Sequence, residues 1–465
     1  MQALFRTLST LLILCTAVNT SVCGQESQNP PNGKWEGKLQ LPSTELRIFF
    51  QIEETAPGKY RARMASPDQG ANNIPVDNVY WKNDSLQLEV KAVGGSYSAR
   101  LSQDKKQLQG YWKQGGGAIP LVVSKTEVLE FYRKRPQEPA KPYPYKEEEV
   151  QYINKAAGNT LGGTLTLPEG SGPFPAVVLI SGSGAQNRDS EIMGHKPFLV
   201  LADYLTRRGI AVLRVDDRGV GKSTGNAATA TSEDNASDVT ASFNFLKAHP
   251  AIDAKKVGLI GHSEGGMIAP VVASQVPGVA YIVLMAGVGF PGDQLHRRQA
   301  EDILRMAKLS EADIQKALAV NDKLYEVIKR EKSSVPIEDK LTAIMLQSTS
   351  DSAAIAPTVK ALSSPWFRYF INFNPVPYLR KVKCPVLAIN GSKDIQVSSK
   401  ENLAAIEKAI KEGGNPNVTI KELEGLNHLF QTAGTGELNE YAKIEETFSP
   451  KAMKVIGDWI EARVK

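Results

Sequence analysis

The chain has 465 residues, of which 42% are hydrophobic, so it is long and apolar enough to form two or three domains with ordinary buried cores. Its 55 lysines and arginines stand against 50 aspartates and glutamates, a formal net charge of +5. So small an excess of positive charge argues against nucleic acid as a partner and against binding to an anionic membrane surface. The sequence has no H-E-x-x-H motif and no cluster of cysteine and histidine, so we expect neither a metal site nor a cofactor.

Residues 1–24 have the pattern of a secretory signal peptide. Arg6 precedes an apolar stretch over residues 8–18, and small and polar residues then lead to Val22-Cys23-Gly24. The apolar stretch is too short to span a bilayer as a helix, so we predict cleavage after Gly24, a secreted or periplasmic protein, and no integral membrane segment in the mature chain. Lipoprotein anchoring at Cys23 is the alternative, although Val22 in front of the cysteine matches a lipobox poorly.

Residues 25–130 are predicted to form a small, antiparallel β-rich domain. Apolar and polar residues alternate over 46–52 and 86–90, and the segments Asn32-Gly33, Lys82-Asn83-Asp84 and Gln103-Asp104-Lys105 are typical of hairpin turns. Tryptophans at positions 35, 81 and 112 are expected in the core of this domain or at its rim. The alternative is a sugar-binding face of exposed tryptophans, which would give the domain a carbohydrate partner.

Prolines among charged residues predict a linker over 131–146, and an α/β domain follows from 147 to 465. Its strands are expected at 176–180, 211–215, 257–260 and 281–285, and its helices at 198–207 and 236–248, as in a mostly parallel sheet with flanking helices. Between about 292 and 382 the pattern becomes helical and rich in charge, which predicts an inserted helical cap. The cap aromatics are expected either to line a substrate pocket or to join the cap to the core; they are Trp366, Phe367, Tyr369 and Phe370.

Gly261-His262-Ser263-Glu264-Gly265 follows the apolar run 257–260 and precedes a helix-compatible segment. This is a G-x-S-x-G nucleophile elbow in its proper context between a strand and a helix. The turn strains the backbone of the serine, and side chains two residues to either side of it would collide, which explains the glycines. Ser263 is therefore predicted to be a catalytic nucleophile. Pro270 is expected to kink the helix that follows.

A nucleophilic serine needs a base to take its proton and a carboxylate to orient that base, and in the α/β-hydrolase fold they follow in the order serine, acid, histidine. Of the histidines at 195, 249, 262, 296 and 428, only His428 lies far enough downstream. Asp394 follows the buried strand pattern 385–390 and a Gly-Ser turn, at the carboxyl end where open α/β sheets place their working residues. The predicted triad is Ser263, Asp394 and His428.

The oxyanion of an acyl-transfer intermediate needs two backbone N–H donors. The residue after the nucleophile, Glu264, supplies the first, and the loop after an earlier strand supplies the second. Ser181-Gly182-Ser183-Gly184 closes the predicted strand 176–180 with small residues. Ser183 is the predicted second donor.

The triplet Gly221-Lys222-Ser223 also ends a Walker A phosphate-binding motif, but that motif needs a glycine five positions before Gly221. Asp216 stands there, and its charge would oppose a phosphate. We therefore interpret the turn as scaffold.

From about residue 147 to its end the chain resembles the α/β-hydrolase superfamily, and within it the bacterial secreted esterase and serine aminopeptidase-like branch. The resemblance lies in the Ser-Gly-Ser-Gly loop with Arg188-Asp189 behind it, in the turn 216–223, and in the Gly-His-Ser-Glu-Gly-Gly elbow. Ser181 is a departure, since many relatives carry histidine at that position. The resemblance implies hydrolysis of esters by the triad named above.

The resulting hypothesis is a carboxylesterase for small or medium acyl esters, with a small-molecule ester as its substrate. A serine aminopeptidase-like peptidase is the alternative, and it would need carboxylates to hold the α-amino group of its substrate. A non-catalytic binding protein, in which the β-rich domain does the work, is a third possibility of a different kind.

Overall fold

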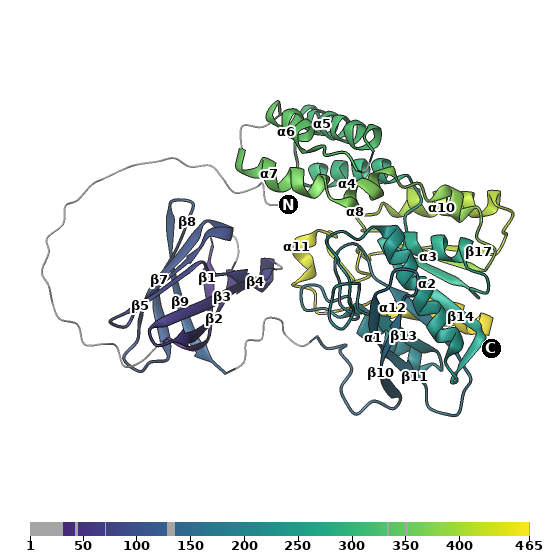
Figure 1. Cartoon of the computed structure of the whole chain (residues 1–465), viewed down its shortest axis with the longest axis horizontal. Coiled ribbons are helices and arrows are strands. Elements are labelled where there is room, and N and C mark those ends of the chain that lie inside the picture. The colour runs from purple at the N-terminus through teal and green to yellow at the C-terminus, as the bar shows by residue number, and fades with distance from the viewer. Residues whose placement is uncertain are drawn as a thin grey trace, which may run out of the picture. The chain divides into compact units, whose positions relative to one another are not determined.

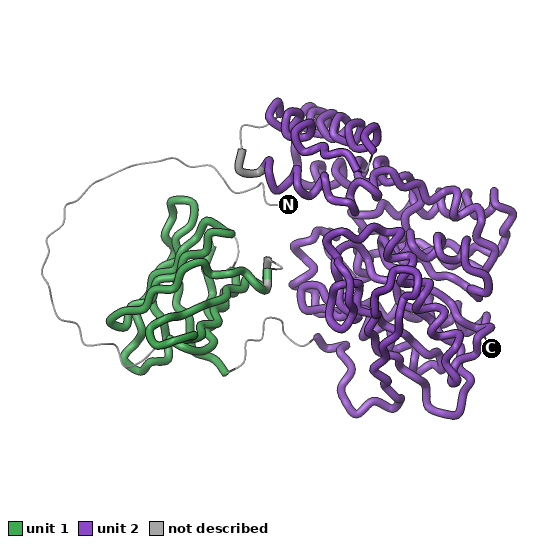
Figure 2. The backbone as a smooth tube through the Cα atoms, viewed as in Figure 1, with its two compact units in different colours: residues 1–134 green, residues 135–465 purple. Residues whose placement is uncertain are grey.

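The computed structural model describes residues 31–41, 45–69, 71–127, 135–332, 334–348 and 352–464. Contacts divide the chain into two compact units, residues 1–134 and 135–465 (Figure 2). The signal peptide predicted for residues 1–24, with Cys23, lies outside the described residues. In the described part of the chain, no helix has both the length and the apolar character needed to cross a membrane.

The first unit is one antiparallel sheet with the strand order β4-β3-β2-β1-β9-β8-β7-β6-β5 (Figure 1). Consecutive strands pair with one another from β1 to β4 and from β5 to β9. β1 also pairs with β9, the last strand, so β4 and β5 stand at the two ends of the strand order. The strands are β1 (Gly33–Gln40), β2 (Glu45–Ala56), β3 (Lys59–Ser66), β4 (Ala71–Pro75), β5 (Asn78–Lys82), β6 (Ser85–Val90), β7 (Gly95–Leu101), β8 (Gln107–Gln114) and β9 (Gly117–Thr126).

The predicted turns at 82–84 and 103–105 join β5 to β6 and β7 to β8. Asn83 and Asp84 both have a positive φ, of 51° and 58°, as a two-residue hairpin turn requires. The third prediction was wrong, because Asn32-Gly33 leads into β1 and forms no hairpin tip.

One face of the sheet carries the apolar core of the first unit. Trp35 and Trp112 are buried in this core with Phe50 and Tyr97, whose rings stack at 5.2 Å. The Tyr97 hydroxyl donates to the carbonyl of Leu108 at 2.8 Å. Trp35 and Trp112 therefore pack the interior, and neither offers its ring to a carbohydrate.

The second unit begins within the segment predicted to be a linker. Residues 131–134 lie outside the described residues, but the Arg135 guanidinium donates to the carbonyls of Met193, Ala442 and Ile444. The Gln137 side chain likewise accepts from the Thr447 amide at 2.6 Å. Because these bonds attach the segment to the second unit, residues 135–146 are part of that unit and are no free connector.

The second unit is built on an eight-stranded sheet with the order β10-β11-β13-β12-β14-β15-β16-β17. β10 and β11 are antiparallel to their neighbours, and the remaining pairs are parallel. The strands are β10 (Lys146–Ile153), β11 (Thr160–Leu167), β12 (Phe174–Ile180), β13 (Ala211–Val215), β14 (Ile252–His262), β15 (Ile282–Met285), β16 (Val386–Gly391) and β17 (Val418–Leu423).

Helices cover both faces of this sheet and bury two separate apolar clusters against it. One face is covered by α1 (Pro197–Arg207) and α12 (Pro450–Val464). The other is covered by α2 (Ser232–Ala248), α3 (Glu264–Gln275) and α10 (Ser399–Glu412). A short helix, α11 (Leu438–Tyr441), precedes α12. The mostly parallel sheet between helical layers confirms the predicted α/β fold, and α3 runs through Pro270 without interruption.

Between β15 and β16 the chain leaves the sheet, and its described residues form six consecutive helices, the predicted cap (Figure 1). They are α4 (Gly292–Met306), α5 (Glu311–Arg330), α6 (Glu338–Leu346), α7 (Ser352–Leu362), α8 (Pro365–Asn372) and α9 (Val376–Leu379). The start of the insertion is bonded to the segment after α8, since the Gly292 amide donates to the Phe373 carbonyl at 2.9 Å.

Candidate active site

Ser263 stands between the end of β14 and the start of α3, with φ 55° and ψ −116°. A serine in this region of conformational space is strained, and surrounding structure must hold it there. The Ser263 amide donates to the Met285 carbonyl at the end of β15, at 2.9 Å. The backbone geometry is that of a nucleophile elbow, as the sequence predicts.

The glycines around Ser263 are required by close approaches of the backbone. A Cβ on Gly265 would lie 2.3 Å from the Ile180 carbonyl oxygen, and a Cβ on Gly261 would lie 2.0 Å from the Gly265 oxygen. The elbow thus packs backbone against backbone, directly against the end of β12. This brings the loop after β12 beside the serine, and a Cβ on Gly182 would lie 3.3 Å from the Ser263 Cβ.

Asp394 and His428 form a buried pair on two neighbouring loops. Asp394 follows β16 and His428 follows β17, so the two parallel strands deliver both side chains to the same edge of the sheet. His428 Nδ1 donates to Asp394 Oδ2 at 2.7 Å, and the Asp394 side chain is fully buried. The other oxygen, Oδ1, accepts from the amides of Gln396 and Val397 at 2.8 and 2.9 Å. These bonds fix the carboxylate and leave Nε2 of His428 as the acceptor nitrogen of the ring.

His262, the residue before Ser263, joins the elbow to the histidine loop. Its Nε2 donates to the His428 carbonyl at 2.8 Å, and the centroids of the two rings lie 4.8 Å apart. Burial, followed by the neighbouring charge of His428, lowers the pKa of His262 to about 4, so its ring is neutral near pH 7. The contact places the backbone of the predicted base beside the predicted nucleophile. Within the described residues, the Ser263 hydroxyl takes part in no hydrogen bond.

The two predicted oxyanion donors belong to different parts of the chain. Glu264 opens α3, and Ser183 lies in the exposed loop beyond β12. No hydrogen bond of the described residues uses the Ser183 N–H as donor. The carbonyl of Ser183 accepts from the Gln186 side chain at 3.1 Å, which shapes the loop.

Asp217, which lies just beyond the end of β13, holds the same loop in place. Its Oδ1 accepts from the Ser181 hydroxyl at 2.6 Å and its Oδ2 from the Gln186 amide at 2.9 Å. Burial raises the pKa of Asp217 to about 7, against the lowering effect of these two hydrogen bonds. The hydroxyl of Ser181 thus ties the loop to Asp217.

The turn 216–223 is scaffold, as its sequence indicates. Asp216 is buried and accepts from Arg188 Nη2 at 2.7 Å and from the Lys222 amide at 3.0 Å. A Cβ on Gly221 would lie 2.4 Å from Asp216 Oδ2. The carboxylate therefore fills the concave backbone that a phosphate would need in a Walker A loop.

Other polar residues near the oxyanion loop are structural. Asp189 pairs with Arg214, and the buried His195 bridges two segments, with Nδ1 3.0 Å from the Thr447 hydroxyl and Nε2 2.8 Å from the Tyr441 carbonyl. Among the described residues, no group of three or more histidine, cysteine or acidic side chains is placed to hold a metal ion.

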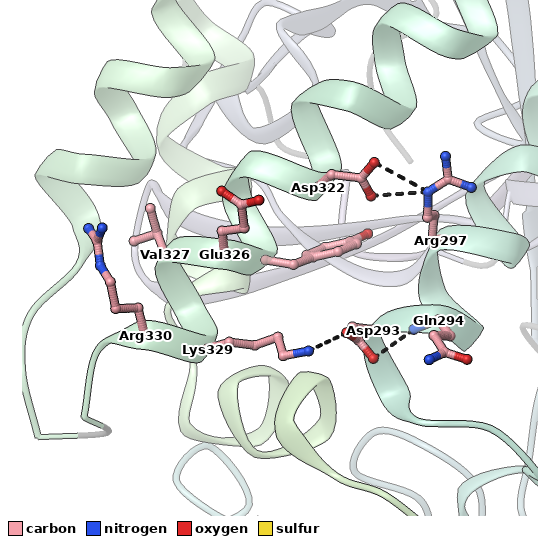
Figure 3. Close-up of a pocket in the computed structure, with 9 residues that line it drawn as sticks. Asp293, Gln294, Arg297, Asp322, Glu326, Val327, Lys329 and Arg330 are labelled. Atoms are coloured by element: carbon pink, nitrogen blue, oxygen red, sulfur yellow. Dashed lines mark hydrogen bonds and ion pairs between the residues drawn. The ribbon is translucent and has the colours of Figure 1, made fainter.

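A pocket of about 630 Å³ lies on the cap, between α4 and α5 (Figure 3). Its charged walls are largely paired, since Arg297 binds Asp322 at 3.0 Å and Lys329 binds Asp293 at 2.5 Å. None of the predicted catalytic residues belongs to it. Its lining consists of Asp293, Gln294, Arg297, Asp322, Tyr325, Glu326, Val327, Lys329 and Arg330.

The elbow and the Asp-His pair thus meet at the carboxyl edge of a mostly parallel sheet, where α/β-hydrolases carry out their chemistry. The chain is an α/β-hydrolase, and the proteins that it resembles include an esterase and a family of peptidases. Within this class it belongs to the X-Pro dipeptidyl-peptidase (S15) family, whose model matches residues 158–424, more than half of the chain.

Individual relatives are distant. The chain is 29% identical to Esterase EstD of Thermotoga maritima over 293 residues, which are 61% of this chain and 62% of that protein, just under two thirds of its length. Among solved structures it is similar to the Pyrococcus furiosus esterase Pf2001, with 16% identity and a TM-score of 0.44 over 72% of this chain and 100% of that one. Est1E of Butyrivibrio proteoclasticus gives 14% identity and a TM-score of 0.41 over 68% and 99% of the two chains.

Reasoning from the sequence missed two residues of the site, His262 and Asp217. Both lie beside motifs that the sequence reveals, His262 within the elbow and Asp217 within the turn 216–223. Their partners, the His428 carbonyl and the Ser181 hydroxyl, lie 166 and 36 positions away in the chain. The signal available in the sequence for His262 was its position directly before the predicted nucleophile.

Proposed function

We propose that this protein is a carboxylesterase that cleaves small or medium acyl esters through an acyl-enzyme on Ser263. The observation that carries the proposal is the buried Asp394–His428 pair, which His262 ties to the strained elbow of Ser263. The match to an esterase of Thermotoga maritima supports an ester as the substrate.

In the proposed reaction, His428 Nε2 takes the proton of the Ser263 hydroxyl as its oxygen attacks the ester carbonyl carbon. The amides of Glu264 and Ser183 hold the oxyanion. The C–O bond to the alcohol breaks, and the alcohol leaves with the proton from His428. Water then attacks the acyl-enzyme, gives one proton to His428, and the acid leaves as Ser263 regains its hydrogen. Asp394 stays ionised throughout.

The hydrogen bond from Ser263 to His428 forms, in this proposal, when substrate occupies the site. Catalytic hydrogen bonds are often long or misaligned before substrate binds, and they tighten in the reactive complex. The members of the site that the structure holds in place are the Asp394 carboxylate and the His428 backbone.

A peptidase that releases X-Pro dipeptides from a free N-terminus is the second candidate, because the family model that matches the chain describes that activity. The same triad would serve, with an amine in place of the alcohol as leaving group. The two candidates differ in the leaving group and in the need to hold a protonated α-amino group.

The test is to label the purified full-length protein with a fluorophosphonate and to measure the intact mass, with Ser263→Ala in parallel. A single adduct on the native protein, absent from the variant, supports the nucleophile. Turnover is then measured with a p-nitrophenyl ester series of increasing acyl length and with an X-Pro p-nitroanilide. Faster cleavage of esters supports the carboxylesterase, and faster cleavage of the anilide supports the peptidase. A folded protein without an adduct would favour the non-catalytic binding protein.

We also propose a secreted or periplasmic location, which rests on the pattern of residues 1–24. Carbohydrate binding by the first unit would have to use surfaces other than Trp35 and Trp112.

A further inference from the structure

The side chain of Glu264, the residue directly after the predicted nucleophile, reaches the cap. It is 2% exposed, and its carboxylate accepts three hydrogen bonds. Ser232 Oγ at the start of α2 donates to Oε1 at 2.6 Å, and the Trp366 indole N–H of cap helix α8 lies 3.0 Å from Oε1 and 2.9 Å from Oε2. One residue therefore carries a proposed oxyanion donor on its backbone and a contact to the cap on its side chain.

The donors that hold this carboxylate are neutral. Within the described residues, no lysine, arginine or histidine forms an ion pair with Glu264, whereas the buried carboxylates of Asp216 and Asp238 pair with arginines. A buried carboxylate without a cation is costly and depends on hydrogen bonds and on the positive end of a helix. Glu264 opens α3, so the helix stabilises its charge, and the indole N–H supplies two of the three contacts.

Trp366 is fixed within the cap. Its ring stacks on Phe370 with centroids 5.3 Å apart and an interplanar angle of 15°. The guanidinium of Arg368, two residues further along α8, donates to the carbonyls of Lys332 and Val335 beyond the end of α5. The indole is therefore held within α8, and α8 is bonded to the segment that follows α5, so a change in the seating of the cap would change the distance from the indole N–H to Glu264.

The other end of the contact has little freedom. The elbow packs against the end of β12, and Gly265 leaves no space for even a Cβ next to the Ile180 carbonyl. The carboxylate and the amide of Glu264 belong to one residue at the start of α3, so the contacts that hold the side chain add to those that hold the amide. Oxyanion stabilisation depends strongly on donor position, and a misplacement of about 1 Å costs on the order of a hundredfold in rate.

We propose that Glu264 is a positioning residue through which cap helix α8 controls the oxyanion hole, so that the seating of the cap determines which acyl groups are turned over. The inference rests on the proposed esterase function. A short acyl group leaves the contact between Trp366 and Glu264 intact, and a long one that lifts α8 breaks it. The carboxylate then remains buried with the Ser232 hydroxyl alone, and the amide of Glu264 loses its orientation.

The experiment compares Trp366→Phe, Glu264→Gln and the double variant with the native protein, over the p-nitrophenyl ester series. Fluorophosphonate titration counts the competent sites, and rates are given per site. Trp366→Phe keeps an aromatic ring but removes the donor. We expect kcat for the shortest ester to fall roughly tenfold, as the loss of a hydrogen bond to a charged group implies. We expect KM to change by less than about threefold and the preference for short chains to weaken.

Two controls separate this role from a structural one. Trp459→Phe removes another indole donor of the second unit, the bond from Trp459 on α12 to the Thr419 hydroxyl at 3.1 Å, and should leave kcat and the chain-length profile unchanged. Ser232→Ala removes the donor to Glu264 that is not on the cap, and should lower kcat without changing the chain-length preference.

The double variant should be no slower than Trp366→Phe, because the two side chains act through one contact. If Trp366→Phe and Glu264→Gln lower the melting temperature but keep the native kcat and chain-length profile per competent site, the contact is structural and the inference is overturned. If Trp366→Phe does not fold, Glu264→Gln decides by the same criteria. An unlabelled, inactive native protein would instead overturn the esterase proposal itself.

Discussion

His262 Nε2 donates to the backbone carbonyl of His428 at 2.8 Å, so the residue before the nucleophile holds the main chain of the residue that is proposed as its base. The Asp394 carboxylate orients the His428 ring, and His262 fixes the position of the chain that bears it. Two of the loops at the edge of the sheet are thereby joined directly at the proposed site of reaction.

His262→Phe should lower kcat about tenfold with little change in KM, because the His428 backbone loses its donor and the base is no longer held beside Ser263. His262→Asn retains a donor and should keep more of the rate. The measurement is steady-state turnover of a short ester, corrected by active-site titration. His249→Gln, which alters a histidine paired with Glu148 at 3.2 Å, is the matched control, and an equal loss there would contradict this role for His262.

His195 should make the protein less stable in acid. Burial, followed by the charge of Arg135, lowers the pKa of His195 to about 4, while the unfolded chain binds this proton near pH 6.5. As the pH falls from 6.5 to 4, the unfolded state is therefore favoured, and the free energy of unfolding drops by at most about 3 kcal/mol. Urea unfolding between pH 7 and 4 measures the slope. In His195→Gln the slope should be shallower, and an unchanged slope would show that other groups cause the acid instability.

Asp217 should have the opposite effect. Burial raises the pKa of Asp217 to about 7, and the unfolded chain loses the same proton near pH 4. As the pH rises from 4 to 7, this group lowers the free energy of unfolding by at most about 4 kcal/mol. Asp217→Asn removes that loss, so the variant should gain stability relative to the native protein as the pH rises, which urea unfolding at pH 5 and 8 measures.

The same variant, Asp217→Asn, should also lower kcat. An asparagine at this position can accept from the Gln186 amide and donate to the Ser181 hydroxyl oxygen, which reverses the Ser181 bond and replaces hydrogen bonds to a carboxylate with weaker neutral ones, so the oxyanion loop would be held less firmly. A native kcat in this variant would mean that the clamp on the loop has no part in catalysis.

The mature protein should begin at Gln25. Intact mass of the protein recovered from the periplasm or medium of an expressing bacterium should equal that of residues 25–465. A mass heavier by a diacylglyceryl group and beginning at Cys23 would instead show lipoprotein anchoring. Uncleaved protein would refute the signal peptide.

Much of the α/β fold follows from local patterns. The elbow is visible because strand, turn and helix are consecutive in the chain, and Asp394 and His428 follow from chain order and strand ends. The contacts of His262 and Glu264 were not predictable, because their partners come from loops and helices that only the folded sheet brings together. The Glu264–Trp366 pair spans 102 positions, and the sequence alone leaves two roles open for Trp366. In the structure its neighbours Phe367 and Phe370 are buried and belong to one apolar cluster with residues of the sheet and of α3.

The boundary between the units shows the same limit. Prolines and charges at 135–146 are equally typical of an exposed connector and of a segment laid on a surface. In the structure the segment lies on a surface, because the Arg135 guanidinium donates to three carbonyls, two of which lie 307 and 309 positions away in the chain. No local property of the segment contains that information.

The cap enters and leaves the fold between two strands that pair directly, with Leu284 of β15 opposite Ala388 of β16. The register of the sheet is therefore independent of the length of the insertion, and relatives are free to exchange one set of helices for another. The contact between the Glu264 carboxylate and the Trp366 indole N–H limits which helices can take that place. A replacement cap without an indole or an equivalent donor would strand a buried carboxylate beside the nucleophile, so the residue at 264 and the helix above it should be inherited together or substituted together.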